Sequence, residues 1–225
     1  MSDREVTTDS SHEHSLAHGL ERLRAIHDEI VRGVAHAMSN RVASLSAGLY
    51  VLGEHGTASA TSVAALQSEL DRMEQLLTQL RMIPRENIPA EPLLALDSAR
   101  TAVALHEHHG ELRNVTCDVQ DIGAVPPARA EPQALLHALL VAINAAKQSA
   151  GSGNARLVLD TEHDIVRFTA TSDMSNPDIT ADNTTFAAEA TAANWLVAPS
   201  GGRAYAIATG CVVEVPTLAS TRRPR

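Results

Sequence analysis

Apolar residues in the first third of the chain recur at spacings of three, four and seven, which predicts a long amphipathic helix over about residues 16–52. This apolar stripe consists of Leu16, Leu20, Leu23, Ile30, Val34, Met38, Val42, Leu45, Leu49 and Leu52. The stretch 53–59 holds two glycines and a candidate N-cap, so the first helix should end there. A second apolar series over 63–80 predicts another helix that ends at Pro84. Together the two segments predict an antiparallel helical hairpin.

A lone hairpin cannot cover the apolar stripes of both helices. We therefore expect a homodimer in which two hairpins form a four-helix bundle. Residues 1–12 are polar and lack apolar periodicity, which predicts a disordered leader and places the hairpin at 13–84. Prolines are dense over 83–92, and this composition predicts an interdomain linker at 85–91.

The pattern changes in the second half, where residues 92–217 alternate between helical and strand-like segments. A helix is predicted over 92–109, a strand over 113–120, and a strongly apolar helix over 131–150. The remaining predictions are strands at 155–160, 165–170, 203–209 and 211–215 and a helix at 189–197. Helices packed on hairpin-connected strands make an α+β two-layer sandwich. Residues 218–225 are expected to form a loose tail.

Charge and composition narrow the choice of partners and compartment. The net charge is -9, with 18 basic against 27 acidic residues, so the surface is unsuited to a nucleic-acid backbone. No apolar run approaches the roughly 18 residues of a membrane span, and the polar, acidic N-terminus is unlike a signal peptide. The two cysteines fit no zinc or redox spacing. We expect a cytoplasmic protein without membrane association.

His36 is the histidine that the helical geometry singles out among the eleven in the chain. At about 100° per residue it lies about 160° from Met38, so it should face solvent opposite the apolar stripe. Asn40 follows one turn later on the same face, within reach of a group bound to the imidazole. An exposed imidazole is a competent nucleophile near neutral pH, and its phosphoryl adduct passes readily to a carboxylate. The pair predicts phosphorelay chemistry.

Other histidines fit this chemistry less well. His27 is followed directly by acids, but Val31 stands one turn on, where an amide or hydroxyl would be needed. His106, His108 and His109 form a cluster without an acid or thiol to complete a metal site. We expect a solvated helix end there and no bound metal.

The six residues His-Ala-Met-Ser-Asn-Arg that begin at His36 resemble the phosphoacceptor box of bacterial sensor histidine kinases. In that box the histidine is followed by an acid, an apolar residue and, at the fourth position, Asn or Thr. Met38 and Asn40 match the box. Ala37 stands where the acid would be, and Arg41 stands where a proline is common, so the resemblance favours a phosphoacceptor over an autokinase.

A second resemblance lies in the helix over 135–147, which is similar to the helix that carries the magnesium-binding asparagine of the kinase ATPase domain. Asn144 and Lys147 match its Asn-Ala-x-Lys core. The glycines that such domains use around the nucleotide are missing from residues 173–177, and none occurs between Asn176 and Ser200. The resemblance therefore implies a degenerate ATPase-like domain with no cofactor of its own, in which Asn144 would bind a nucleotide only if ATP were bound at all.

A phosphoacceptor hairpin joined to a degenerate ATPase-like domain resembles the dimeric histidine phosphotransferases of bacterial phosphorelays. This resemblance implies that His36 shuttles a phosphoryl group between the aspartates of response-regulator receiver domains, with Asn40 assisting and Mg²⁺ supplied by the receiver. Arg32 and Ser39 would contact the receiver, although a solvated charge explains Arg32 as well. Two alternatives stay open: a divergent soluble histidine kinase that binds ATP through Asn144, and a pseudo-kinase scaffold that binds a response regulator without chemistry.

Overall fold

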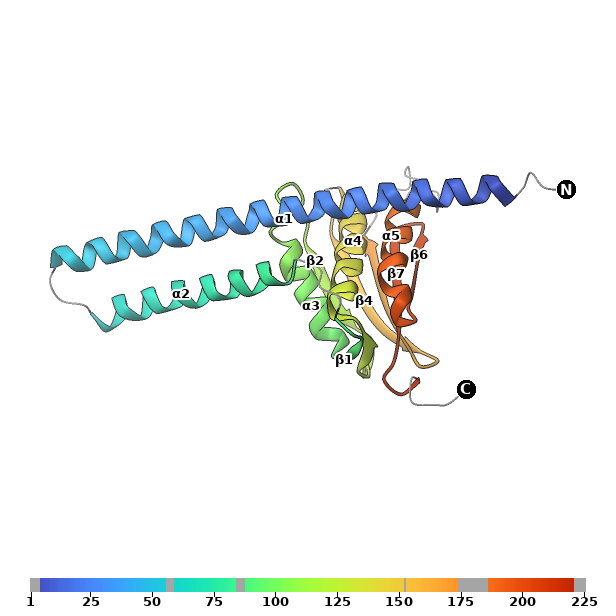
Figure 1. The fold of residues 1–225 in the computed structure, drawn as a ribbon. Coiled ribbons are helices and arrows are strands. Elements are labelled where there is room, and N and C mark those ends of the chain that lie inside the picture. The colour runs from blue at the N-terminus through green and yellow to red at the C-terminus, as the bar shows by residue number, and fades with distance from the viewer. Residues whose placement is uncertain (1–4, 56–58, 84–87, 152, 174–185, 221–225) are drawn as a thin grey trace.

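The protein consists of a long helical hairpin that projects from an α/β domain (Figure 1). The structure, a computed structural model, describes residues 5–55, 59–83, 88–151, 153–173 and 186–220. Helix α1 spans Glu5–His55, and α2, which spans Ala60–Arg81, returns antiparallel beside it. The Ser59 hydroxyl caps α2 by accepting a hydrogen bond from the Ser62 backbone N–H at 3.1 Å. The predicted hairpin is confirmed.

The C-terminal domain is built on a mixed sheet of five strands in the order β2-β4-β5-β7-β6. These strands span Cys117–Asp121 (β2), Ala155–Glu162 (β4), Ile165–Ser172 (β5), Arg203–Ile207 (β6) and Gly210–Pro216 (β7). Strand β2 pairs parallel with β4, and the other pairs are antiparallel. Burial alternates along β5 and along β4 up to Asp160, because successive side chains point to opposite faces. One face of the sheet therefore belongs to the core.

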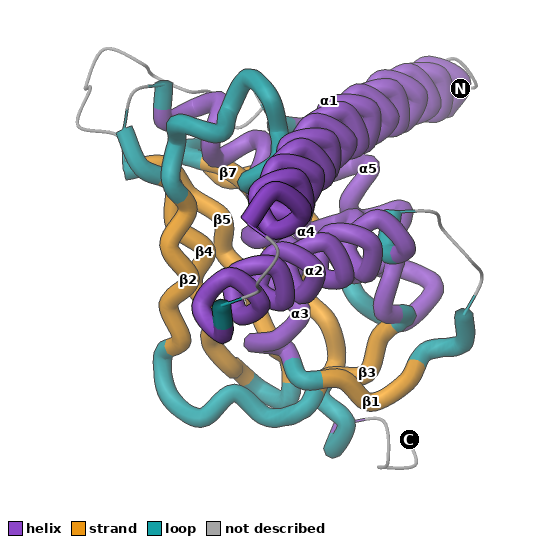
Figure 2. The backbone as a smooth tube through the Cα atoms, turned by 90° about the vertical axis from the view of Figure 1, so that its left-hand side faces the viewer, coloured by secondary structure: helices purple, strands orange, loops and turns teal. Residues whose placement is uncertain are grey.

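Three helices cover that face of the sheet (Figure 2). They are α3 (Ala95–His106), α4 (Pro132–Ala150) and α5 (Ala187–Val197), and α5 is followed by the 3₁₀ turn η1 (Ala198–Ser200). Helix α4 is the central one and is buried continuously from Ala134 to Lys147. The predicted α+β two-layer arrangement is confirmed.

Several predicted boundaries differ from the structure. Short strands β1 (Glu91–Leu93) and β3 (Ala128–Ala130) pair antiparallel, so β1 lies where the linker ends and the helix predicted from residue 92 begins only at Ala95. Three-residue strands carry too little periodicity to be predicted. The predicted strand over 113–120 starts at Cys117 instead.

The ends of the predicted domains also differ. Helix α1 begins at Glu5 within the predicted disordered leader, because extending a formed helix adds one hydrogen bond for each residue fixed. In the predicted tail, the Leu218 N–H donates to the Pro127 carbonyl at 2.8 Å. Residues 1–4, 84–87 and 221–225, which belong to the predicted leader, linker region and tail, lie outside the described residues.

The N-terminal half of α1 packs against the C-terminal domain, mainly along α5 and α4 (Figure 1). Two glycines allow this close approach. A Cβ at Gly19 would lie 2.2 Å from the Ala188 carbonyl oxygen, and one at Gly33 would lie 1.8 Å from that of His108. The sequence pattern predicted that a second hairpin would cover the apolar stripe, whereas in the first half of α1 the C-terminal domain of the same chain covers it.

Within the described ranges, none of the helices combines the length and the hydropathy of a membrane span.

Candidate functional site

His36 and Asn40 lie together on the exposed side of α1. Both side chains are exposed, and Asn40 Nδ2 lies 3.3 Å from His36 Nε2. Because an amide nitrogen only donates, Nε2 accepts this bond and the ring proton resides on Nδ1. The arrangement gives an accessible imidazole whose Nε2 lone pair is directed toward a polar neighbour.

The packing of α1 explains why this face stays open. Ile30 and Val34 are both 0% exposed because they pack on the C-terminal domain. His36 stands two residues beyond Val34 and about 160° from it around the helix. The domain therefore holds α1 next to His36 without covering the imidazole.

Arg32 and Ser39, the predicted partner-binding residues, are exposed on the same side as His36. Arg32 forms an ion pair with Glu29 one turn toward the N-terminus. The Ser39 hydroxyl donates to the Ala35 carbonyl at 2.9 Å, as serine often does within a helix. Both side chains are available to a partner, although each has an intramolecular bond to exchange.

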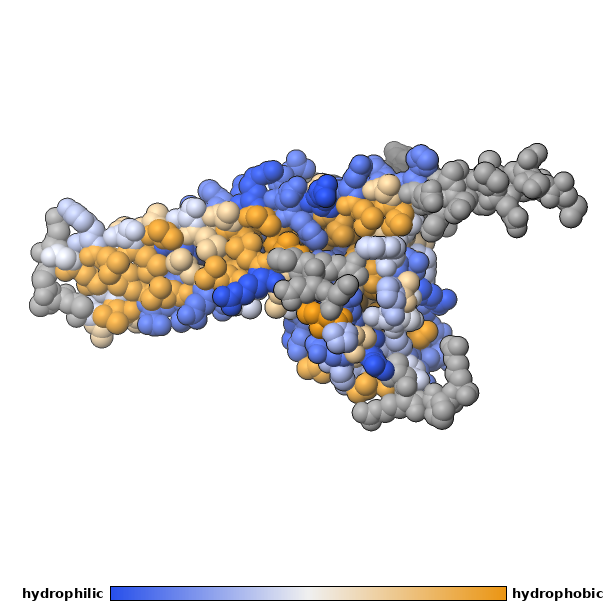
Figure 3. Space-filling view, viewed as in Figure 1, coloured by the Kyte–Doolittle hydropathy of each residue, from blue (hydrophilic) through white to orange (hydrophobic). Residues whose placement is uncertain are grey.

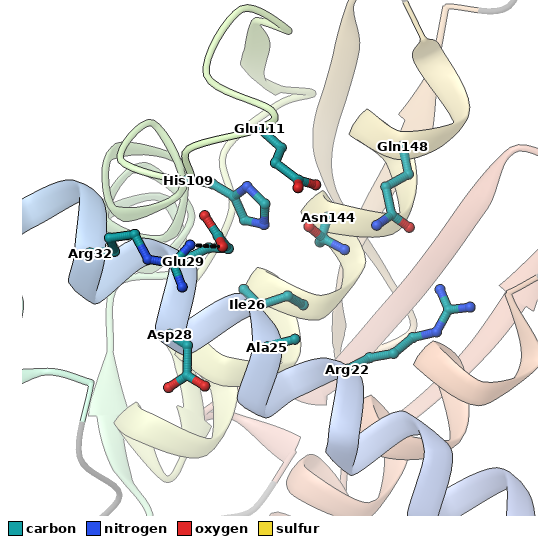
Figure 4. A pocket seen from close by; sticks show the side chains of 10 residues that line it. All are labelled: Arg22, Ala25, Ile26, Asp28, Glu29, Arg32, His109, Glu111, Asn144 and Gln148. Atoms are coloured by element: carbon teal, nitrogen blue, oxygen red, sulfur yellow. Dashed lines mark hydrogen bonds and ion pairs between the residues drawn. The ribbon is translucent and has the colours of Figure 1, made fainter.

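A polar cavity of about 590 Å³ lies between α1, α4 and the segment 109–111 (Figure 4). Its lining consists of Arg22, Ala25, Ile26, Asp28, Glu29, Arg32, His109, Glu111, Asn144 and Gln148. The ion pair of Arg32 with Glu29 stands at this cavity, as the dashed line in Figure 4 shows. The cavity therefore has Asn144 and Arg32 in the same lining.

The histidines at the end of α3 are buried, so the predicted solvated helix end is wrong. His106 is 0% exposed and His109 is 5% exposed, and their rings stack with centroids 5.1 Å apart. Burial, together with Lys147 and His109, lowers the pKa of His106 to about 3. The cause of the error is tertiary: α4 and α1 cover this end of α3. In the described part of the chain no three His, Cys, Asp or Glu side chains are grouped as a metal site would need.

Asn144, the residue that matched the magnesium-binding position, is 2% exposed and engaged with the protein itself. Its Oδ1 lies 3.3 Å from His106 Nε2, so the imidazole with its proton on that nitrogen donates to the amide. Lys147 is 1% exposed, and burial lowers the pKa of its ammonium group. To coordinate a nucleotide-bound metal, Asn144 would have to give up this bond.

No protein-family model matches this sequence, and no curated protein matches it either. Solved structures do match. The catalytic domain of histidine kinase ThkA aligns over 58% of this chain and 98% of its own, with 11% identity and a TM-score of 0.45. The chain is similar in fold to histidine kinases.

Two further solved structures align over a larger share of this chain. Histidine kinase ThkA in complex with response regulator protein TrrA aligns over 91% of this chain and 65% of its own, with 16% identity and a TM-score of 0.45. A bacterial phosphotransferase aligns over 86% and 95%, with 13% identity and a TM-score of 0.36. With such low identities and TM-scores, these proteins resemble the chain in fold alone.

His27, the histidine ranked below His36, lies in a different environment. It is half-buried between α1 and α4, with its ring centroid 4.6 Å from that of His137. Burial lowers the pKa of His27, and among the described residues its Nε2 has no hydrogen-bond partner. Nε2 of His27 is therefore buried, whereas the His36 side chain is exposed.

Two features of the site were missed from the sequence. The burial of His106 and His109 depends on contacts between distant segments, and no local pattern indicates it. Glu29 did leave a signal, because an acid three residues before Arg32 is the spacing of an intrahelical ion pair.

Proposed function

We propose that this protein is a histidine phosphotransfer protein of a two-component phosphorelay. His36 accepts a phosphoryl group from the aspartate of one response-regulator receiver domain and donates it to another, without ATP. The observation that carries this proposal is the exposed His36 imidazole with the Asn40 amide 3.3 Å from Nε2. The neighbouring residues Ala35, Ser39 and Asn40 are exposed as well.

The transfer is an in-line displacement at phosphorus. The Nε2 lone pair of His36 attacks the aspartyl phosphate, the N–P bond forms, and the P–O bond to the carboxylate breaks. The carboxylate leaves with that electron pair, and the imidazole keeps its Nδ1 proton until a water or carboxylate removes it. Asn40 then exchanges its bond to Nε2 for one to a phosphoryl oxygen. Donation to the second receiver is the reverse of these steps.

The receiver supplies the remaining parts of the reaction. Its aspartate holds the phosphoryl group, and its Mg²⁺ balances the charge on the phosphoryl oxygens. Arg32 and Ser39, exposed one turn before and almost one turn after His36, are placed to contact the docked receiver. This protein then needs no metal or nucleotide of its own.

The docking of α1 favours a relay over a divergent histidine kinase. A kinase must carry a bound nucleotide to its histidine, which requires its ATPase domain to move relative to the hairpin. Here Gly19 and Gly33 hold α1 in close backbone contact with the domain, and Arg22 forms an ion pair with the buried Glu189. Asn144 is also engaged with His106. We propose that the ATPase-like domain steadies α1 and borders the docking surface.

The far half of the hairpin supports the proposed homodimer. Large apolar side chains are 41–60% exposed along α1 and α2, and Figure 3 shows an apolar surface that runs along the hairpin. These side chains include Val42, Leu49, Val63, Leu70 and Leu77. A second hairpin would cover this surface as a four-helix bundle.

Phosphoryl transfer from labelled receivers tests the proposal. Wild type, His36→Gln and His18→Gln would each be mixed with phosphorylated receiver domains and, separately, with labelled ATP. His18 is an exposed histidine on the same helix and serves as the matched control. We expect label from receivers on wild type and His18→Gln but not on His36→Gln, and no label from ATP. Rapid labelling of wild type by ATP alone would favour the divergent kinase, and no labelling in either arm would favour the pseudo-kinase scaffold.

A further inference from the structure

We infer that Glu29 is a positioning residue that restrains Arg32 and so keeps the phosphoryl group on His36 easy to pass on. This inference rests on the proposed function. By pairing with Arg32, the Glu29 carboxylate holds the guanidinium one helical turn away from His36. Arg32 is then prevented from trapping the phosphohistidine.

Glu29 and Arg32 differ in how far their side chains are exposed and packed. The Glu29 side chain is 22% exposed and the Arg32 side chain is 71% exposed. Glu29 Oε2 lies 2.9 Å from the point where a Cβ on Gly110 would be, so the segment after α3 packs against the carboxylate. On the same segment, the charge of Glu29 acts to raise the pKa of His109, against the larger lowering by burial. The C-terminal domain therefore holds the carboxylate, while the guanidinium can change partner.

The geometry of α1 places Arg32 between two competing anions. Residues 29, 32 and 36 lie on one side of the helix, with side chains about 5–6 Å apart from one turn to the next. Helical side chains lean toward the N-terminus, so Arg32 leans toward Glu29, and a group on His36 leans back toward Arg32. Arg41, the next basic residue along α1, is tied to Glu69 on α2. Arg32 is thus the basic residue that can pair either with Glu29 or with the phosphoryl group on His36.

The charges determine how the partner of Arg32 affects the stability of the phosphohistidine. A phosphoryl group brings nearly two negative charges and three strong acceptor oxygens. A free guanidinium would bind those oxygens in a charge-assisted, bidentate manner and would stabilise the phosphohistidine. Pairing with Glu29 cancels most of the charge of Arg32 before any phosphoryl group arrives. The phosphohistidine then keeps a high transfer potential toward the next receiver.

A substitution at Glu29 tests the inference at equilibrium. Glu29→Gln preserves the shape of the side chain and removes its charge. With a phosphorylated receiver, we expect the ratio of phosphohistidine to phosphoaspartate to rise about three-fold over wild type, as is typical of an exposed ion pair. The rise should vanish in an Arg32→Gln background and shrink at high salt, where exposed charges are screened. Glu21→Gln, an exposed acid on the same helix, should leave the ratio unchanged.

The possible outcomes separate the two claims. A ratio unchanged by Glu29→Gln, or changed equally with and without Arg32, would overturn the inference while leaving phosphotransfer by His36 intact. Absence of phosphohistidine in wild type and in all variants would instead reject the proposed function, and this inference with it. The free energy of unfolding of Glu29→Gln, measured in the same buffer, distinguishes a charge effect from loss of the fold.

Discussion

The two halves of α1 carry similar apolar patterns but meet different surroundings. In the first half, Leu23, Ile26 and Ile30 are at most 8% exposed because they pack on the C-terminal domain. In the second half, Val42 and Leu49 are 50% and 60% exposed. One half is therefore covered by its own chain, and the other half keeps its apolar side chains exposed.

His36 lies at the boundary between these two halves. The first half fixes the helix relative to the C-terminal domain, and the second half carries the exposed apolar residues of the proposed dimer surface, while the His36 side chain is exposed. Both kinds of packing can hold the imidazole in place without burying it.

The largest effect is expected from placing a charge on the dimer surface. Leu49→Glu would bury two carboxylates in a symmetric interface, and we expect the dimer dissociation constant to rise by about 100-fold or more. Analytical ultracentrifugation measures this change. Ala43→Glu, on the His36 side of the same helix, is the control and should stay dimeric. A monomeric wild type would refute the dimer itself.

The next effect concerns the docked half of α1. Gly33→Ala would place a Cβ 1.8 Å from the His108 carbonyl oxygen, so α1 must shift, and we expect a loss of about 2 kcal/mol in the free energy of unfolding. Gly53→Ala is the matched control, because a Cβ there meets nothing within 4 Å. It should be neutral or slightly stabilising. Equal effects of the two substitutions would mean that α1 is not packed on the domain.

A pH-dependent effect, spread over several pH units, comes from the buried His106. The pKa of His106 is lowered to about 3 in the folded protein. Between pH 6.5 and about 3, His106 is therefore protonated in the unfolded chain and neutral in the folded protein. Stability should therefore fall as the pH drops below about 6.5, with a slope of up to about 1.4 kcal/mol per pH unit. Urea denaturation at several pH values measures this slope. His106→Gln should flatten it, and an unchanged slope would argue against burial of the imidazole.

The smallest effect is expected at the site itself. Asn40→Ala removes one hydrogen-bond donor to the phosphoryl group, worth about 1 kcal/mol, so the transfer rate should fall about five-fold. Rapid-quench measurement of label transfer from a receiver detects this change. Ser46→Ala, an exposed substitution farther along α1, should have no effect. A normal rate in Asn40→Ala would remove Asn40 from the mechanism.

The elements were predictable from the sequence because their patterns are local. The stripe of α1, the two glycines before α2 and the apolar run of α4 each specify an element by its own residues. What covers each apolar face was not predictable, since Ile30 and Leu49 are alike in sequence and differ only in tertiary contact. The same limit explains the error at His106 and His109. His36 and Asn40 were recognisable because their pairing needs only the helical repeat.

Locating the phosphoryl group tests the central claim most directly. The protein would be incubated with a phosphorylated receiver and without ATP, digested under conditions that preserve phosphohistidine, and mapped by mass spectrometry. We expect phosphorylation of His36 alone among the eleven histidines. A phosphoryl group on any other residue, such as His27, with His36 unmodified, would contradict it.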